Sequence, residues 1–209
     1  MGFCPNSMGF SAVLRAISYG NGGIAAAEIS TDWCIVMSEI RIMQRLEPPD
    51  IHYLSAAVGW VELGNLVEAE ADLNRVSVEH QCHPDVLEVR WIILGQSKRW
   101  DAALEISRTL LKLAPNRCSG WLHHAYSLRR ASKDGLKRAW DALLPAYDKF
   151  PGESTIPYNL SCYACQMHQF DEARAWLRRA LKIGNKAEIK QRALDDPDLR
   201  PLWEEIRDL

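Results

Sequence analysis

The sequence predicts an all-α fold, a right-handed α-solenoid built from helix-turn-helix repeats. Two observations predict it. Apolar residues recur at spacings of three, four and seven, which mark one face of a helix. The same pattern then returns about every 34 residues along the 209-residue chain. A chain of this length can hold one large core or a stack of smaller units, and the fixed period favours the stack.

The period is clearest in a column of alanines. These alanines stand 34, 36 and 34 residues apart: Ala69, Ala103, Ala139 and Ala173. A large apolar residue stands three positions before each of them: Leu66, Trp100, Leu136 and Phe170. This spacing places the apolar residue and the alanine on one face of a helix. We therefore expect each alanine to lie on the packed face of the second helix of its unit.

A second column lies upstream and marks the first helix of each unit. Its members are mostly small and stand 34, 34 and 36 residues apart: Ala57, Trp91, Ala125 and Ser161. Small residues at matching places let two helix backbones approach closely. Trp91 departs from this pattern. The predicted units are 50–83, 84–117, 118–153 and 154–187.

At these columns the chain resembles the tetratricopeptide repeat (TPR) family. That family has about 34 residues per unit, W-x-x-L-G-x-x-Y in the first helix, A-x-x-x-F in the second, and a closing proline. The best matches are "YLSAAVGWVELGNLVEAEADL" and "YNLSCYACQMHQFDEARAWLRRALKI". The third unit carries two extra residues in its inter-helix turn, and Pro145 should kink or shorten its second helix. The resemblance implies a concave groove, lined by the first helices, that binds a protein segment.

The two ends of the chain fall outside the repeats. Residues 188–209 predict a capping helical segment that covers the last apolar face, with "DDPD" at 195–198 as a solvated turn. Residues 37–49 form an N-terminal flank. Residues 1–36 show no helical period, so we interpret them as a disordered leader or a mis-annotated start. Translation would then begin at Met37 or Met43 rather than at Met1.

Composition narrows the function. A net charge of −2 gives no general attraction to nucleic acid or to an anionic membrane surface. The apolar runs are shorter than the ~18 residues that a membrane helix needs. Six dispersed cysteines and a poor secretory leader favour a reducing cytoplasm. We expect no cofactor and no metal ion, and a monomer or a weak homo-oligomer.

Cys162 and Cys165 form a C-x-x-C pair that could suggest redox or metal chemistry. A redox pair normally sits at a helix N-terminus, whereas these residues lie well inside a predicted helix. A zinc site takes about four ligands, and a second C-x-x-C is missing from the sequence. A structural or groove-lining role is therefore favoured, and a thiol or metal role stays as an alternative. No motif for catalysis is present in the sequence, so we expect no enzyme activity.

The resemblance, combined with helical spacing, places a set of side chains in the groove of the third and fourth units. They are Leu122, His123, Tyr126, Arg129, Arg130, Tyr158, Asn159, Cys162, Cys165 and Gln166. Arg and Tyr are common anchors at interfaces. We therefore expect a non-catalytic scaffold that binds a protein or peptide in this groove. A self-associating assembly module is the other alternative.

Overall fold

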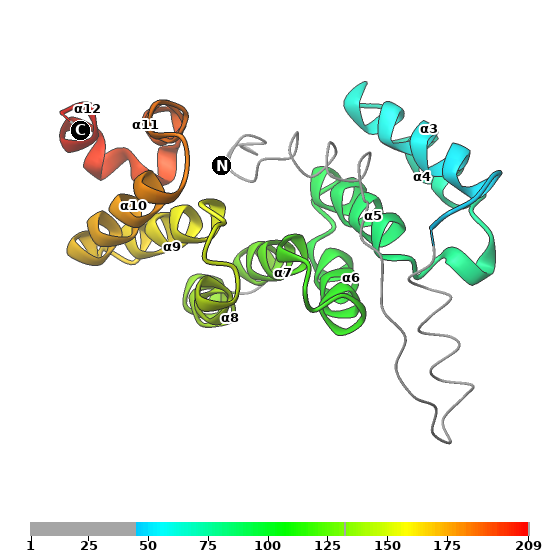
Figure 1. The fold of residues 1–209 in the computed structure, drawn as a ribbon, viewed down its shortest axis with the longest axis horizontal. Coiled ribbons are helices and arrows are strands. Elements are labelled where there is room, and N and C mark those ends of the chain that lie inside the picture. Colours follow the sequence, from blue (N-terminus) through cyan, green and yellow to red (C-terminus); the bar gives the residue numbers. More distant parts are fainter. Residues whose placement is uncertain (1–44, 132, 209) are drawn as a thin grey trace, which may run out of the picture. The chain divides into compact units, whose positions relative to one another are not determined.

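The structure is a computed structural model that describes residues 45–131 and 133–208, and every regular element in this part is helical. The helices follow one another in pairs (Figure 1): α3 (Asp50–Glu62) with α4 (Leu66–Leu73), α5 (Pro84–Gln96) with α6 (Trp100–Leu113), α7 (Cys118–Ala131) with α8 (Gly135–Lys149), and α9 (Thr155–Gln166) with α10 (Phe170–Ile183). The predicted all-α fold of helix pairs is confirmed. The expectations for residues 1–36, and for a start at Met37 or Met43, lie outside the described residues.

The described residues form two compact units, one ending at Pro115 and the other beginning at Asn116. In the first, α5 packs against both α3 and α4. Within this unit, Asp50 at the start of α3 contacts the residues around the short 3-10 helix η2 (Val78–His80). Its carboxylate accepts hydrogen bonds from the backbone and side chain of Ser77, and it lies 2.6 Å from the His80 ring. Burial opposes ionisation of Asp50, but these hydrogen bonds hold its pKa below the usual value.

The second unit holds two helix pairs and the C-terminal elements. Helix α8 packs on α9, so the pair α7–α8 is followed directly by the pair α9–α10. Helix α11 (Lys186–Asp195) packs on α10, and the 3-10 helix η3 (Pro197–Leu202) packs on α9. Helix α12 (Trp203–Arg207) then packs against α11 and η3. The capping segment is thus divided at "DDPDLRP" into α11 and the shorter elements η3 and α12.

The two columns read from the sequence lie at the helix contacts. The four alanines of the second helices are all 0% exposed: Ala69, Ala103, Ala139 and Ala173. The column on the first helices is equally buried, including Trp91 at 0%. In that second pair a Cβ built on Gly95 would lie at ordinary contact distance, 3.5 Å, from the Trp100 ring, so Gly95 faces the second helix of its pair.

The turns between paired helices share a left-handed residue in three of the four pairs. Gly64, Lys98 and His168 have φ angles of 76°, 59° and 60°. Glycine adopts this conformation freely, whereas lysine and histidine do so at a cost of roughly 1 kcal/mol. In the remaining pair Gly135 begins α8, and a Cβ on it would lie 2.4 Å from the backbone oxygen of Arg129, so no larger residue fits.

Two expectations need correction: that Pro145 shortens its helix, and that "DDPD" is a solvated turn. Helix α8 continues through Pro145 to Lys149, so this proline does not shorten it. Pro145 is exposed, and the carbonyl group that loses its hydrogen bond can therefore be solvated. The "DDPD" sequence is not simply a solvated turn, because Asp196 is only 3% exposed. Its surroundings form part of the candidate site.

The alanine column leads to a stability prediction. Replacing Ala69 by leucine should lower the free energy of unfolding by about 1–3 kcal/mol, because extra methyl groups overpack a closed helix contact. Ala71→Leu is the matched control, since Ala71 lies in the same helix and is exposed. It should change stability by less than about 0.5 kcal/mol. Urea unfolding followed by circular dichroism measures both, and equal losses would contradict the proposed packing role of Ala69.

Candidate functional site

Residues 196–202, which we call the tail segment, lie on helix α9 and reach helix α7 by a side-chain contact. At the start of the segment, the side-chain carboxylate of Asp196 accepts a hydrogen bond from the backbone N–H of Asp198, at 3.0 Å. Pro197 follows in the first turn of η3, a position where its missing N–H costs nothing. Local sequence therefore starts a short 3-10 helix here, and contacts with α7 and α9 hold it.

The strongest of these contacts is an ion pair between Arg129 of α7 and Asp198. Two guanidinium nitrogens of Arg129 donate to the two carboxylate oxygens, at 2.5 and 2.7 Å. The side chains are 15% and 23% exposed, so water screens the pair only partly. Burial alone would lower the pKa of Arg129, but the hydrogen bonds and charge of Asp198 raise it above its usual value. The guanidinium is therefore charged at any pH at which the protein is folded.

The second carboxylate, Asp196, is enclosed by α9. The Tyr158 hydroxyl donates to it at 3.0 Å, and the Cys162 thiol at 3.6 Å. Arg192 of α11 lies over the Tyr158 ring, 4.1 Å from its centre. Burial raises the pKa of Tyr158, and the nearby Cys162 and Asp196 add to the shift. Tyr158 is thus a neutral hydrogen-bond donor here.

The tail segment is also held by its backbone. The Gln166 side chain donates from Nε2 to the carbonyl oxygen of Asp198 at 2.9 Å. Gln166 lies at the C-terminal end of α9, and Arg129 lies near the C-terminal end of α7. Asp198 is therefore held at both its carboxylate and its carbonyl by the ends of two different first helices.

The structure favours the structural interpretation of the C-x-x-C pair. Cys162 and Cys165 are 2% and 1% exposed. Burial raises the pKa of the Cys162 thiol well above its usual value, and raises that of Cys165 to about 11, with Asp196 and Asp198 adding to both shifts. The reactive thiolate form is disfavoured in such surroundings. This environment is the opposite of the one that activates a redox cysteine.

A metal site at the same place is poorly supported. Cys162, Asp196 and Asp198 each place one potential ligand atom within 4.8 Å of the others. A tetrahedral zinc site takes four ligands, however, and Arg129 already binds both oxygens of Asp198. Its positive charge opposes a cation at this point. We therefore assign the three side chains to the attachment of the tail segment.

The structure changes how the predicted groove residues are understood, because most of them are not open to a partner. The buried ones are Leu122, His123, Tyr126, Tyr158, Asn159, Cys162 and Cys165. Arg129, Arg130 and Gln166 are half-buried. The tail segment contacts Tyr158, Cys162 and Gln166 directly, and Asn159 donates to the Thr155 carbonyl of its own helix. The expected accessibility of these buried side chains is therefore wrong, and their role in binding stays a prediction.

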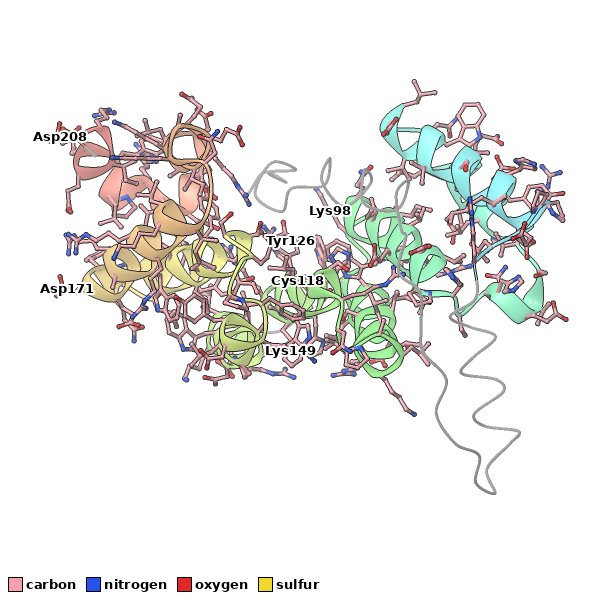
Figure 2. All side chains as sticks on the ribbon, in the orientation of Figure 1. Lys98, Cys118, Tyr126, Lys149, Asp171 and Asp208 are labelled. Atoms are coloured by element: carbon pink, nitrogen blue, oxygen red, sulfur yellow. The ribbon has the colours of Figure 1, made fainter. Side chains whose placement is uncertain are left out.

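Two of the groove residues on α7 form a local pair. Arg130 donates to the Tyr126 hydroxyl at 3.1 Å and lies over the same ring, 4.9 Å from its centre. Figure 2 labels Tyr126. His123, one turn earlier, is 3% exposed, and burial lowers its pKa to about 3. It is therefore neutral at pH 7 and adds no charge to this side of α7. Arg129 and Arg130 supply the positive charge.

The sequence reasoning missed Asp196 and Asp198 as residues of this site. Both carboxylates stand far from their partners in the sequence, and helical spacing on α7 or α9 does not reveal them. One signal was available in the segment itself. Asp196, Leu199 and Leu202 are three residues apart, and all three are at most 3% exposed. A spacing of three is the period of a 3-10 helix with one buried face.

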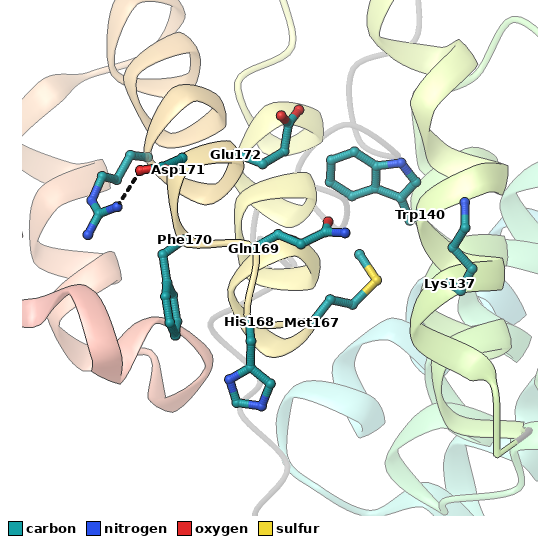
Figure 3. A pocket seen from close by; sticks show the side chains of 9 residues that line it. Lys137, Trp140, Met167, His168, Gln169, Phe170, Asp171 and Glu172 are labelled. Carbon is teal, nitrogen blue, oxygen red and sulfur yellow. Dashed lines mark hydrogen bonds and ion pairs between the residues drawn. The ribbon is translucent and has the colours of Figure 1, made fainter.

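Apart from the site of the tail segment, the structure has an open cleft of about 600 Å³ between α8 and the start of α10 (Figure 3). Trp140, Met167 and Phe170 line it beside several charged residues. The charged groups are engaged by neighbours: Lys137 pairs with Asp141, and Arg174 pairs with Asp171 and Glu205. The cleft thus lacks a set of polar groups that converge on one point, and we assign no ligand to it.

These features define the class of the protein as a helical-repeat protein with its C-terminal segment folded onto the first helices. No helix in the described residues is long and apolar enough to cross a membrane. A search of solved structures found a crystal structure of TTC0263, a thermophilic TPR protein of Thermus thermophilus. The chain is 20% identical to it, with a TM-score of 0.58 over 77% of this chain and 100% of the other. The likeness shows that this chain has the tetratricopeptide-repeat fold. No family model and no curated protein matches the sequence.

The ion pair leads to a prediction for a double-mutant cycle. Arg129→Met and Asp198→Asn should each lower the free energy of unfolding by about 1.5–3 kcal/mol, the value typical of hydrogen bonds to charged groups. The double variant should lose clearly less than the sum of the two, because each single variant leaves the other charge without its partner. Urea unfolding of the four proteins gives the coupling. Additive losses would mean that the two side chains act independently.

The cysteines lead to a prediction about thiol reactivity. In the native protein Cys82, which is exposed, should react with a thiol reagent such as DTNB within the mixing time. Cys162 and Cys165 should react at least about a hundredfold more slowly, because they are buried and protonated. Mass spectrometry after alkylation assigns each site, and protein in denaturant is the control. Rapid labelling of Cys162 in the folded protein would contradict this prediction and would favour a redox role for the pair.

Proposed function

We propose that this chain is a non-catalytic interaction scaffold, and that α7 and α9 bind a protein or peptide segment on the side now covered by the tail segment. One observation carries the proposal: side chains of these two first helices already hold a short segment by its carboxylates and its backbone. Arg129, Gln166 and Tyr158 do so at hydrogen-bond distance. A surface that recognises one segment in this way has the chemistry to recognise another.

The fold supports the same proposal. Paired helices with closed contacts give a surface that need not be ordered when a partner binds, so less conformational entropy is lost. The polar groups of this surface are a guanidinium with two parallel donors, an amide and a phenol. These groups fix the orientation of a peptide through its carbonyl and carboxylate oxygens. The chemistry serves binding, and none of it requires a reaction.

Self-association is the weaker candidate. Among the described residues, the large apolar side chains that are clearly exposed include Leu63, Val67 and Val78, at 76%, 77% and 86%. They lie in the first repeat, residues 50–83. Single exposed apolar residues are ordinary on soluble proteins, however, and these three do not define a packed patch. We therefore do not raise self-association to a second proposal.

The proposal is tested by affinity capture from native cell extract with two charge-reversal variants. Arg130→Glu reverses a charge beside Arg129, on the proposed surface. Arg138→Glu makes the same change on the exposed side of α8 and is the matched control. A partner held by wild type and by Arg138→Glu should be lost at least about tenfold by Arg130→Glu, because like charges at an interface cost more than about 1.4 kcal/mol.

Circular dichroism and thermal melting must show that both variants are folded. Equal capture of the same proteins by all three chains would place the binding surface elsewhere. Capture lost equally in both variants would point to a non-specific effect of net charge, and would also count against the proposed surface.

A further inference from the structure

We infer that the tail segment is an intramolecular occupant of the binding surface, and that the partner which replaces it carries the same chemistry. The partner segment is acidic, with two aspartates two residues apart followed by leucines, in the pattern D-x-D-L-x-x-L. This inference rests on the proposed function, since it names the partner of the same surface.

The contacts divide cleanly into a receptor and a ligand. The receptor side contributes donors from two helices: the guanidinium of Arg129, the amide of Gln166, the hydroxyl of Tyr158 and the thiol of Cys162. In these hydrogen bonds the tail segment contributes the acceptors, namely two carboxylates and one carbonyl oxygen. An ordinary capping helix buries an apolar face against the last helix pair. The tail segment also buries two leucines, but its contacts with α7 and α9 add polar and directional recognition, as in the binding of a peptide.

The positive charge of Arg129 requires an anion at this position. Its side chain is 15% exposed, and Asp198 neutralises it through both carboxylate oxygens. If the tail segment left and an uncharged segment took its place, the guanidinium would remain partly buried without a counter-ion. Such an arrangement is strongly unfavourable. A competing segment must therefore bring a carboxylate to the place of Asp198.

The rest of the pattern follows from the geometry of η3. A 3-10 helix has three residues per turn, so Asp196, Leu199 and Leu202 share one face. These three are 3%, 0% and 2% exposed, whereas Pro197, Arg200 and Pro201 are exposed. The first aspartate accepts hydrogen bonds from Tyr158 and Cys162, and the two leucines are the buried apolar side chains of the segment. The exposed positions leave the identity of the other residues open.

The tether makes the tail segment a strong competitor. It is joined to α9 through only α10 and α11, which pack on their neighbours. A tethered segment of this kind acts at an effective concentration in the millimolar range. A separate partner therefore binds wild-type protein weakly, and binds more tightly when the tail segment loses its own carboxylates. Occupancy by the tail thus sets the affinity of the scaffold.

The test uses the full chain and a fluorescent peptide of its own residues 195–203, DDPDLRPLW. The variant Asp196→Asn with Asp198→Asn weakens the tail and leaves α7 and α9 unchanged. Fluorescence anisotropy should show the peptide binding this variant at least tenfold more tightly than wild type. The matched control, Asp195→Asn with Asp208→Asn, removes two charges from exposed positions and should behave like wild type.

Two further controls test the chemistry. A peptide with both aspartates of the pattern changed to asparagine should bind the weakened variant at least tenfold more weakly. Adding Arg129→Met to that variant should have the same effect on the unchanged peptide. A folded variant that binds the peptide no more tightly than wild type would overturn the inference. Light scattering that shows a dimer exchanging its tail segments would also overturn it, because the occupant would then be a second copy.

If the weakened variant does not fold, hydrogen exchange on wild-type protein decides the question. The Asp198 and Leu199 amides are hydrogen-bonded to Asp196 within the tail segment. Excess peptide should speed their exchange at least severalfold, and unchanged protection would overturn the inference. If the peptide does not bind but partner capture still depends on Arg130, the proposed binding function is retained and only this ligand is rejected. If the peptide does not bind and capture does not depend on Arg130, the proposed function itself is rejected.

Discussion

The close approach of paired helices at the alanine positions is the constraint on which the rest of the structure depends. Ala125 of α7 and Ala139 of α8 are both 0% exposed, and the Ser161 hydroxyl of α9 donates to the Ala173 carbonyl of α10 at 2.8 Å. Larger residues at these points would separate the backbones. Ala125 and Ser161 occupy equivalent positions in α7 and α9. Residues at the same distance after each of them are therefore also equivalent. Arg130 and Gln166 therefore hold matching positions at the ends of α7 and α9. Gln166 donates to the Asp198 carbonyl, and Arg129, next to Arg130, donates to the Asp198 carboxylate.

The ion pair at Asp198 contributes more to specificity than to stability. Removing a guanidinium and a carboxylate from water costs free energy that their attraction only partly returns, so a pair of apolar residues could stabilise the fold as well. An apolar pair would accept many segments, whereas Arg129 accepts only one that brings a carboxylate to the right place. The bidentate geometry restricts the choice further, because both oxygens must face the fork of donors. The pair thus determines which segment lies on α7 and α9.

The sequence predicted the repeats well and the site poorly, for physical reasons. The alanine column and its small partner column are local patterns with a fixed period, and packing of neighbouring helices follows from them directly. Asp198 is 69 positions from Arg129 and belongs to no repeat, so no periodicity links the two. Charged residues near prolines are usually solvated, and this general rule gave the wrong surroundings for Asp196. The groove residues were placed on the correct helices, but a segment of the same chain covers several of them.

The cysteine pair that first suggested chemistry is explained by the same covering segment. The Cys162 thiol donates to Asp196 at 3.6 Å, and both thiols are held protonated by burial beside the two aspartates. The low reactivity that we expect of Cys162 and Cys165 follows first from their burial, and the two aspartates of the tail segment add to it. A segment that replaced the tail with the same D-x-D pattern would keep Cys162 covered and its hydrogen bond satisfied. One without the first aspartate would leave the buried Cys162 thiol without this acceptor, and would leave the Tyr158 hydroxyl only the Arg192 carbonyl oxygen at 3.3 Å. This loss adds a penalty against the wrong partner.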